Sequence, residues 1–493
     1  MSDGTNQNLN SGLFWAFMER IGSQGVSLVV SIILARLIIP SEYGIISAVQ
    51  IFTTIATVFV TGGISSALIQ KKDADELDYS SMFWYNTVFS LFVYLIVYLT
   101  SPFLVRILNA SYDYGLLTKV LRISGIGFVF ASFNSFYRTI LVRELKFKKT
   151  FFVTLLGTLT SAAIGIFMAY KGFGVWALVA QTIVSYAANS VFLVLFTRWI
   201  PKFRFSWNRL KPMLGYGYKL MTSSLLTTVY MEANSMVVGN RFSSETLAFY
   251  NKGASFPKLI VANIISAINT VLFPVMTKIK TREENVSFIK KFNKTSSFII
   301  APMMFGFAAV APAFIEVLLG PQWLPCVPFL QLACVDYALQ PIGISNLQYW
   351  KASGRATLYL VADIIKKVFA FALIILTVCL NKGALFLAIM QIVSTVFGIF
   401  INLIPQKKYL NYSVFSQIKD VLLQYLLSAV MFAAVYFLGQ IPWSNVIVKL
   451  VVQIVFGAAI YIGTAKLVKM PELDDVMGMI GKRLKKGGAK VEK

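Results

Sequence analysis

The feature that most constrains this chain is a series of long apolar stretches, each about 18–25 residues, that recurs from one end to the other. An α-helix of that length crosses the ~30 Å hydrocarbon layer of a bilayer. Inside that layer the backbone must satisfy its own hydrogen bonds, so a long apolar run forms a helix. Strands of a membrane barrel would instead alternate apolar and polar residues. The runs therefore predict an all-α integral membrane protein.

Composition supports this fold class and excludes several kinds of chemistry. Only 13% of the 493 residues are charged and 57% are hydrophobic, whereas a soluble chain carries about 25% charged residues. Histidine is absent, and the three cysteines have no metal-ligand spacing. The net charge of +24 would suggest nucleic acid in a soluble protein, but here Lys and Arg flank the apolar runs. We therefore expect no cofactor, no metal, no disulfide and no nucleic acid.

The apolar runs predict about fourteen transmembrane helices joined by short loops. The expected spans are roughly 11–35, 44–69, 81–99, 120–140, 150–170, 174–196, 213–238, 253–277, 295–317, 326–350, 357–379, 383–404, 420–438 and 445–465. The first, seventh and tenth contain polar residues and are the weakest of the set. The first run is too long for the apolar part of a signal peptide, so we expect it to stay as an uncleaved span.

Loop charge predicts the orientation. With these spans and the N-terminus inside, about four in five of the loop Lys and Arg residues fall on one side of the membrane. Cytoplasmic loops carry such an excess, and a miscounted span would reverse every later loop. The pattern predicts a multi-pass protein of the bacterial inner (plasma) membrane with both termini in the cytoplasm.

A weak internal repeat predicts the domain organisation. Residues 35–44, between the first two expected spans, resemble residues 240–247, between the seventh and the eighth. Parallel repeats about an axis along the membrane normal are one transporter plan, although a chance match is the alternative. The expected parts are an N-lobe of six helices (1–205), a C-lobe of six helices (206–410), two further helices (411–470) and a basic tail (471–493). The tail is either an amphipathic helix on an anionic leaflet or a solvated segment.

Polar side chains inside the spans are the candidate functional residues, because each costs about 2.5–3.5 kcal/mol to insert. Such residues usually face a water-filled cavity or one another. Cations outnumber acids among them, and Arg and Lys suit a diphosphate. The substrate-binding candidates are Arg20, Gln24, Lys219, Asn234 and Lys258, and the coupling candidates are the acids Glu19, Glu232 and Asp336. Buried structural pairing is the alternative for five of them, namely Glu19, Arg20, Glu232, Lys258 and Asp336.

Some charged residues, including three of these candidates, also have simpler interpretations. Asp363 and Lys367 lie four residues apart on one expected helix and should form an ion pair. Glu19 and Arg20 are neighbours whose side chains point about 100° apart, so they need not pair with each other. Arg138 and Lys219 lie near the inner surface and are able to extend their charged ends into water.

Several short motifs occur in a fixed order on this span pattern. They are Ser11-Gly12, Ala35-Arg36-Leu37 with Glu42-Tyr43-Gly44, Ile69-Gln70-Lys71-Lys72, Arg143-Glu144-Leu145-Lys146-Phe147, Leu272-Phe273-Pro274 with Lys278-Ile279, and Gly320-Pro321-Gln322-Trp323 with Pro328-Phe329-Leu330-Gln331-Leu332. In this arrangement the chain resembles the Wzx-type polysaccharide flippases of the MOP superfamily, in the branch that includes colanic-acid exporters. None of the motifs is a catalytic signature.

The resemblance implies a MATE-like V of two six-helix lobes plus two C-terminal helices. A central cavity would be lined by the first, second, seventh and eighth spans. Proteins of this kind are thought to move undecaprenyl-diphosphate-linked oligosaccharides from the cytoplasmic to the periplasmic leaflet by alternating access, for lipopolysaccharide or exopolysaccharide assembly. The resemblance further implies a monomeric transporter rather than an enzyme, working beside a polysaccharide polymerase and other assembly proteins.

Two other functions stay open on the sequence. A cation-coupled exporter of small molecules, of the multidrug type, belongs to the same superfamily, but it would need a cavity dominated by acids. A membrane glycan polymerase or transferase usually carries a long periplasmic loop with catalytic residues. The largest outward loops expected here, about 100–119 and 239–252, look small for that role.

Overall fold

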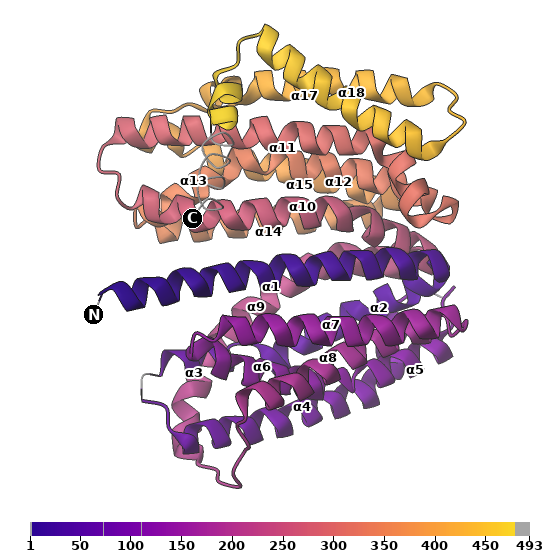
Figure 1. Ribbon diagram of the computed structural model, residues 1–493, viewed down its shortest axis with the longest axis vertical. Helices are drawn as coiled ribbons and strands as arrows, with labels where there is room; N and C mark the ends of the chain where they lie inside the picture. The colour runs from indigo at the N-terminus through magenta and orange to yellow at the C-terminus, as the bar shows by residue number, and fades with distance from the viewer. Residues whose placement is uncertain (1, 72, 110, 479–493) are drawn as a thin grey trace, which may run out of the picture. The chain divides into compact units, whose positions relative to one another are not determined.

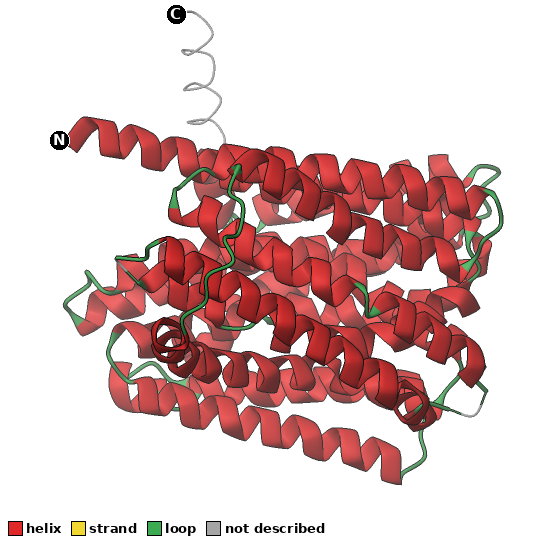
Figure 2. Ribbon diagram, turned by 90° about the horizontal axis from the view of Figure 1, so that it is seen from below, coloured by secondary structure: helices red, strands yellow, loops and turns green. Residues whose placement is uncertain are grey.

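The computed structural model describes residues 2–71, 73–109 and 111–478. Across these ranges the regular structure is helical, joined by loops and turns, and no strand is drawn among them (Figure 2). The chain divides into two compact units, residues 1–248 and 249–493. The all-α fold class predicted from the apolar runs is confirmed.

The described part of the first unit contains nine α-helices and the first turn of a tenth, α10 (Figure 1). Their bounds are α1 Ser2–Leu37, α2 Pro40–Thr61, α3 Ile64–Gln70, α4 Glu76–Leu104, α5 Tyr114–Ser124, α6 Gly127–Arg143, α7 Phe147–Tyr170, α8 Val175–Thr197 and α9 Trp207–Arg241, with the short 3-10 helix η1 Val105–Ile107 after α4. Within this unit α7 packs on α1 and α8, α6 on α4 and α8, and α9 on α2 and α3.

The second unit is built around α11. Its helices are α10 Ser244–Met276, α11 Arg282–Leu319, α12 Val327–Leu339, α13 Pro341–Ala352, α14 Ala356–Cys379, α15 Ala384–Leu403, α16 Gln406–Leu410, α17 Val414–Gln440 and α18 Val446–Leu467, with the 3-10 helix η2 Pro321–Cys326 after α11. Helix α11 packs on α12, α17 and α18.

Ten of the described helical segments are long and apolar enough to cross a membrane, and the bent pair α12–α13 brings the number to eleven. The chain is thus a multi-pass membrane protein, but the expected count of fourteen is not confirmed. Helices also occupy the seventh, eighth and eleventh expected spans, as α9, α10 and α14, yet they are not among the ten. Helix α9 is rich in Ser, Thr and Asn, and α14 carries Asp363, Lys366 and Lys367. The ion pair expected in α14 is confirmed, because Lys367 Nζ lies 2.9 Å from Asp363 Oδ2.

Three expected spans are broken, each for a local reason. Gly62 and Gly63 separate α2 from α3, and the carbonyl oxygen of Gly217 on α9 lies so close to Gly63 that a Cβ there would overlap it. Gly63 has a φ of 84°, which glycine adopts without steric penalty. Residues 125–126 separate α5 from α6, and Pro341 begins α13 after a bend of 41° from the preceding helix.

An aromatic cluster packs one end of α6 in the first unit. Phe136 and Tyr137 of α6 contact Phe83 of α4 and Trp199 beyond α8, with ring centroids 5.1–6.1 Å apart. Phe136 is fully buried. Aromatic pairs of this kind stabilise beyond the area they bury. The cluster holds α6 in place just before Arg138, the residue that follows Tyr137.

The second unit joins its helices through neutral polar contacts. Asn346 of α13 donates to Gln417 of α17 at 2.9 Å, and both side chains are fully buried. Ser345 donates to Asn293 of α11 at 2.6 Å. The described start of the C-terminal tail is helical over 471–478. Its Leu473 packs beside Val435 and Tyr461. The basic part of the expected tail, 479–493, lies outside the described residues.

Candidate functional site

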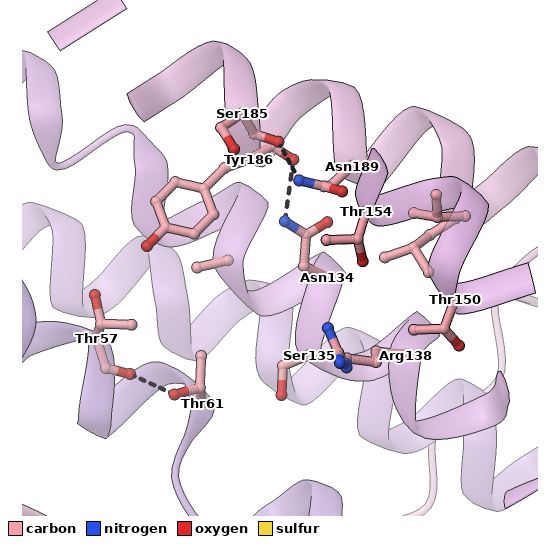
Figure 3. A pocket seen from close by; sticks show the side chains of 13 residues that line it. Thr57, Thr61, Asn134, Ser135, Arg138, Thr150, Thr154, Ser185, Tyr186 and Asn189 are labelled. Carbon is pink, nitrogen blue, oxygen red and sulfur yellow. Dashed lines mark hydrogen bonds between the residues drawn. The ribbon is translucent and has the colours of Figure 1, made fainter. Parts of the chain in front are cut away.

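A polar pocket lies inside the first unit, between helices α2, α6, α7 and α8 (Figure 3). Its volume is about 290 Å³. The polar lining consists of Thr57, Thr61, Asn134, Ser135, Arg138, Thr150, Thr154, Ser185, Tyr186 and Asn189. All four helices belong to stretches that are apolar enough to span a membrane. Hydroxyl and amide groups therefore surround a hollow within an otherwise apolar bundle.

Helical spacing aims these side chains at one hollow. Thr57 and Thr61 on α2, and Thr150 and Thr154 on α7, are four residues apart and so lie on one face of each helix. Ser185 and Asn189 repeat the spacing on α8. The Thr61 hydroxyl donates to the Thr57 carbonyl at 2.9 Å, which satisfies it within its own helix. Such a hydroxyl still accepts a hydrogen bond from a ligand.

Two contacts between α6 and α8 hold the amide side of the pocket. The side-chain nitrogen of Asn134 donates to the Tyr186 carbonyl at 3.1 Å, and Ser190 donates to Asn134 Oδ1 at 2.8 Å. Gly157 of α7 lies opposite Asn189, whose side chain a Cβ at that position would strike. A small residue on α7 thus leaves room for an amide on α8.

An ion pair between α1 and α6 supplies the charge of the site. Arg138 Nη2 donates to Glu19 Oε1 at 2.6 Å, and the Thr154 hydroxyl donates to the same oxygen at 3.2 Å. The two partners differ in exposure: the Glu19 side chain is 10% exposed, whereas that of Arg138 is 52% exposed. The carboxylate depends on its partner because burying an unpaired charge is costly. The guanidinium retains donors for an anion or a hydroxyl-bearing ligand.

The eight predicted site residues fall in both units. Glu19 contacts the pocket lining as described. In the first unit Arg20 and Lys219 are exposed, and Gln24, Glu232 and Asn234 are half-buried. In the second unit Lys258 is exposed, and buried Asp336 accepts a hydrogen bond from Thr395 of α15. The roles proposed for these residues stay predictions.

Sequence reasoning missed most of the pocket. Arg138 was interpreted as a residue that reaches the surface, and Thr154, Asn134 and Asn189 were not singled out. A signal for them exists, because pairs of small polar residues four apart recur in the spans that become α2, α7 and α8. The pairing of Glu19 with Arg138 joins residues 119 positions apart, which spacing does not reveal.

No group of three or more metal-ligating side chains gathers within the described residues. The pocket described above presents hydroxyls and amides, with the Glu19–Arg138 ion pair beside them.

The comparisons with known proteins agree with this architecture. A family model described as "Polysaccharide biosynthesis protein" matches residues 33–328. The chain belongs to that family. The match runs from the end of α1 to the start of α12 and includes all four helices of the pocket.

Named relatives and solved structures extend this result. The chain is 25% identical over 345 residues to the succinoglycan biosynthesis transport protein ExoT of Rhizobium meliloti, covering 69% of this chain and 68% of that one. It is 25% identical over 341 residues to the lipopolysaccharide biosynthesis protein WzxC of Escherichia coli, covering 68% of each.

Among solved structures, the lipid II flippase MurJ in an inward closed conformation shares the fold. The TM-score is 0.72 at 18% identity, over 93% of this chain and 98% of that one. An inward-facing multidrug resistance MATE transporter of the MOP superfamily gives a TM-score of 0.59 at 15% identity, over 84% and 95%. The expected MATE-like fold class is therefore confirmed.

Proposed function

We propose that this protein is a flippase for a lipid-linked oligosaccharide. It moves the undecaprenyl-diphosphate-linked glycan from the cytoplasmic to the periplasmic leaflet by alternating access. The lipid tail stays in the bilayer while the polar headgroup passes through the protein. The observation that carries this proposal is a hydroxyl- and amide-lined pocket within apolar helices, in a chain that belongs to a polysaccharide biosynthesis family.

The chemistry of the pocket suits a sugar. Sugar rings present many hydroxyls, each a donor and an acceptor, and the lining offers matching groups on four helices, such as Ser135, Thr154 and Asn189 on three of them. A pocket of this volume holds a small part of a glycan, so we assign it to one end of the headgroup. The relatives' names support a transported glycan, since ExoT is named for succinoglycan biosynthesis transport.

The ion pair has a separate role in this proposal. Glu19 is buried and Arg138 is half exposed, so the guanidinium is placed to exchange the carboxylate for the diphosphate as its partner. Glu19, Glu232 and Asp336 are the coupling candidates in this proposal. The basic residues Arg20, Lys219 and Lys258, with the amides of Gln24 and Asn234, are proposed to complete the path of the headgroup.

The proposed setting is the inner membrane with both termini in the cytoplasm. Its support is the excess of Lys and Arg in alternate loops. The proposed partners are the glycolipid, the bilayer, a polysaccharide polymerase and other assembly proteins, and the flippase works as a monomer. No bond in the cargo changes, so it is a transporter and not an enzyme.

Deleting the gene in a strain without a paralogue tests the function. The lipid-linked oligosaccharide should accumulate in the cytoplasmic leaflet, chemically unchanged by mass, and the surface polymer should disappear. Restoring the wild-type gene should reverse both effects. Unchanged surface polymer would contradict the proposal. Loss of resistance to cationic drugs with normal polymer would favour the small-molecule exporter, and shortened glycan chains would favour a polymerase.

A further inference from the structure

A second, more basic pocket lies in the second unit, at one end of the helix bundle. It is formed by the N-terminal parts of α11 and α17 and by the segment that follows α18, and its volume is about 630 Å³. Its lining includes four lysines, Lys290, Lys294, Lys419 and Lys469. Lys290 and Lys294 are four residues apart and so share one face of α11.

The pocket carries more positive than negative charge. Lys290 Nζ lies 2.9 Å from Asp420 Oδ1, and Lys294 Nζ lies 3.8 Å from Glu472 Oε1. Both acids line the pocket, and each is paired with one of these two lysines. Within the described residues Lys419 and Lys469 have no acidic partner within 4 Å, so two positive charges are left for a ligand.

A buried acceptor lies in the same pocket. The Gln424 side chain is 2% exposed, and its Oε1 has no hydrogen-bond donor among the described residues. A buried polar atom of this kind normally has a partner. The pocket wall therefore combines ammonium groups, which bind an anion, with a residue whose buried carbonyl oxygen lacks a donor, so that a small rotation of this side chain would present the oxygen to a ligand hydroxyl or N–H.

The pocket lies where two apolar spans end. The apolar span of α17 begins at Val414, that of α18 ends at Leu467, and the lining residues Ser416 and Lys469 are close to these two ends. Lys469 has a left-handed φ of 56°, and the chain turns back there to place Pro471 and Glu472 in the wall. Basic pockets between transmembrane helices at this level bind phospholipid headgroups.

We propose that this pocket binds the headgroup of one anionic phospholipid of the phosphatidylglycerol type. The ammonium groups of Lys419 and Lys469 bind the phosphate, and a glycerol hydroxyl donates to Gln424 Oε1. This lipid is a resident of the second unit and not the cargo, so the proposal goes beyond the flippase function and does not depend on it.

A lipid titration tests this site on the full-length chain. The purified protein in an uncharged detergent is titrated with short-chain phosphatidylglycerol, and bound lipid is counted by native mass spectrometry. Phosphatidylglycerol should bind more tightly than phosphatidylcholine, whose headgroup has no net charge. Each exposed lysine near the surface contributes about fivefold in affinity, so Lys419→Gln with Lys469→Gln should weaken binding about 25-fold. Lys382→Gln, an exposed lysine outside the pocket, is the matched control and should change nothing.

Two further measurements identify the ligand. Gln424→Met removes the acceptor at similar volume. It should weaken phosphatidylglycerol but not phosphatidylmethanol, which has the phosphate and no hydroxyl. Inorganic phosphate at the same concentration should fail to displace the lipid. The proposal is overturned if the lysine variant binds phosphatidylglycerol as wild type does, if phosphatidylcholine binds equally well, if Gln424→Met weakens both anionic lipids alike, or if free phosphate competes fully.

Discussion

The two units handle charge within the membrane in different ways. The first unit places an ion pair, Glu19 with Arg138, against a polar pocket between apolar helices. The second unit has several of its ion pairs at helix ends, as in Lys290 with Asp420, and joins its buried helices by neutral amides such as Asn346 and Gln417. A charge beside a hollow can change partners, whereas two amides buried against each other mainly hold helices together. We therefore expect the Glu19–Arg138 pair of the first unit to change partners during transport, and the Asn346–Gln417 pair of the second unit to stay in place.

The largest expected effect tests the asymmetry of the ion pair. Arg138→Gln strands the buried Glu19 carboxylate and should lower the free energy of unfolding by about 3 kcal/mol. Glu19→Gln strands a guanidinium that is 52% exposed and should cost about 1 kcal/mol or less. Denaturant titration of the protein in detergent measures both.

A control for this prediction comes from the second unit. Lys367→Gln breaks the pair with Asp363, in which both side chains are about one-third exposed, and should cost about 0.5 kcal/mol. Equal losses for Arg138→Gln and Lys367→Gln would show that the two units treat charge alike.

A close approach in the first unit gives the next effect. Gly63→Ala should cost about 2 kcal/mol, because the new Cβ meets the Gly217 carbonyl and the left-handed backbone disfavours alanine. Gly172→Ala is the matched control, since Gly172 has a φ of 80° but no neighbouring atom within 4 Å. Denaturant titration gives the loss of unfolding free energy for each variant. The difference between the two losses isolates the contact of α3 with α9. Identical losses would mean that α9 does not pack tightly there.

The amide pair of the second unit should matter for stability and not for transport. Asn346→Leu or Gln417→Leu removes the hydrogen bond between the two buried amides, although the remaining amide still donates to a backbone carbonyl, and should cost about 1 kcal/mol. The double variant should recover part of that loss, which a double-mutant cycle measures. A variant that folds normally yet fails to move glycolipid would give the second unit a moving part as well.

The smallest expected effect lies outside the membrane, at the start of α4. Asp75 caps this helix. A hydrogen bond from the backbone N–H of Asp78, together with the nearby Arg209 guanidinium, lowers the pKa of the Asp75 carboxyl below the ordinary 3.8. A carboxyl whose pKa is lower in the folded state than in the unfolded state stabilises the fold at a pH above its unfolded-state pKa. That stabilisation is lost as the pH falls through the folded-state pKa. Asp75→Asn keeps the cap but not the charge. The gap in melting temperature between wild type and variant should close on acidification, and a gap that stays constant with pH would contradict this.

The sequence predicts much of the fold, because apolar length and loop charge act locally along the chain. The α14 ion pair also follows from spacing alone. Helix breaks such as Gly62–Gly63 were missed, since they depend on how closely α9 approaches. The pocket was missed for a related reason. Thr154 and Asn189 are ordinary residues in an apolar helix until folding turns them toward one hollow, and Arg138 gains its partner from α1.

Transbilayer movement of a lipid-linked oligosaccharide in reconstituted vesicles tests the central claim most directly. The cargo carries a fluorescent label that a membrane-impermeant reductant quenches when it reaches the outer leaflet. Wild type should move the cargo many times faster than empty vesicles. Glu19→Gln should slow it about fivefold while staying folded, since about 1 kcal/mol is about a fivefold change in rate, and Asn346→Leu should keep the wild-type rate. Wild-type vesicles no faster than empty ones, or Glu19→Gln at full rate, would contradict the claim.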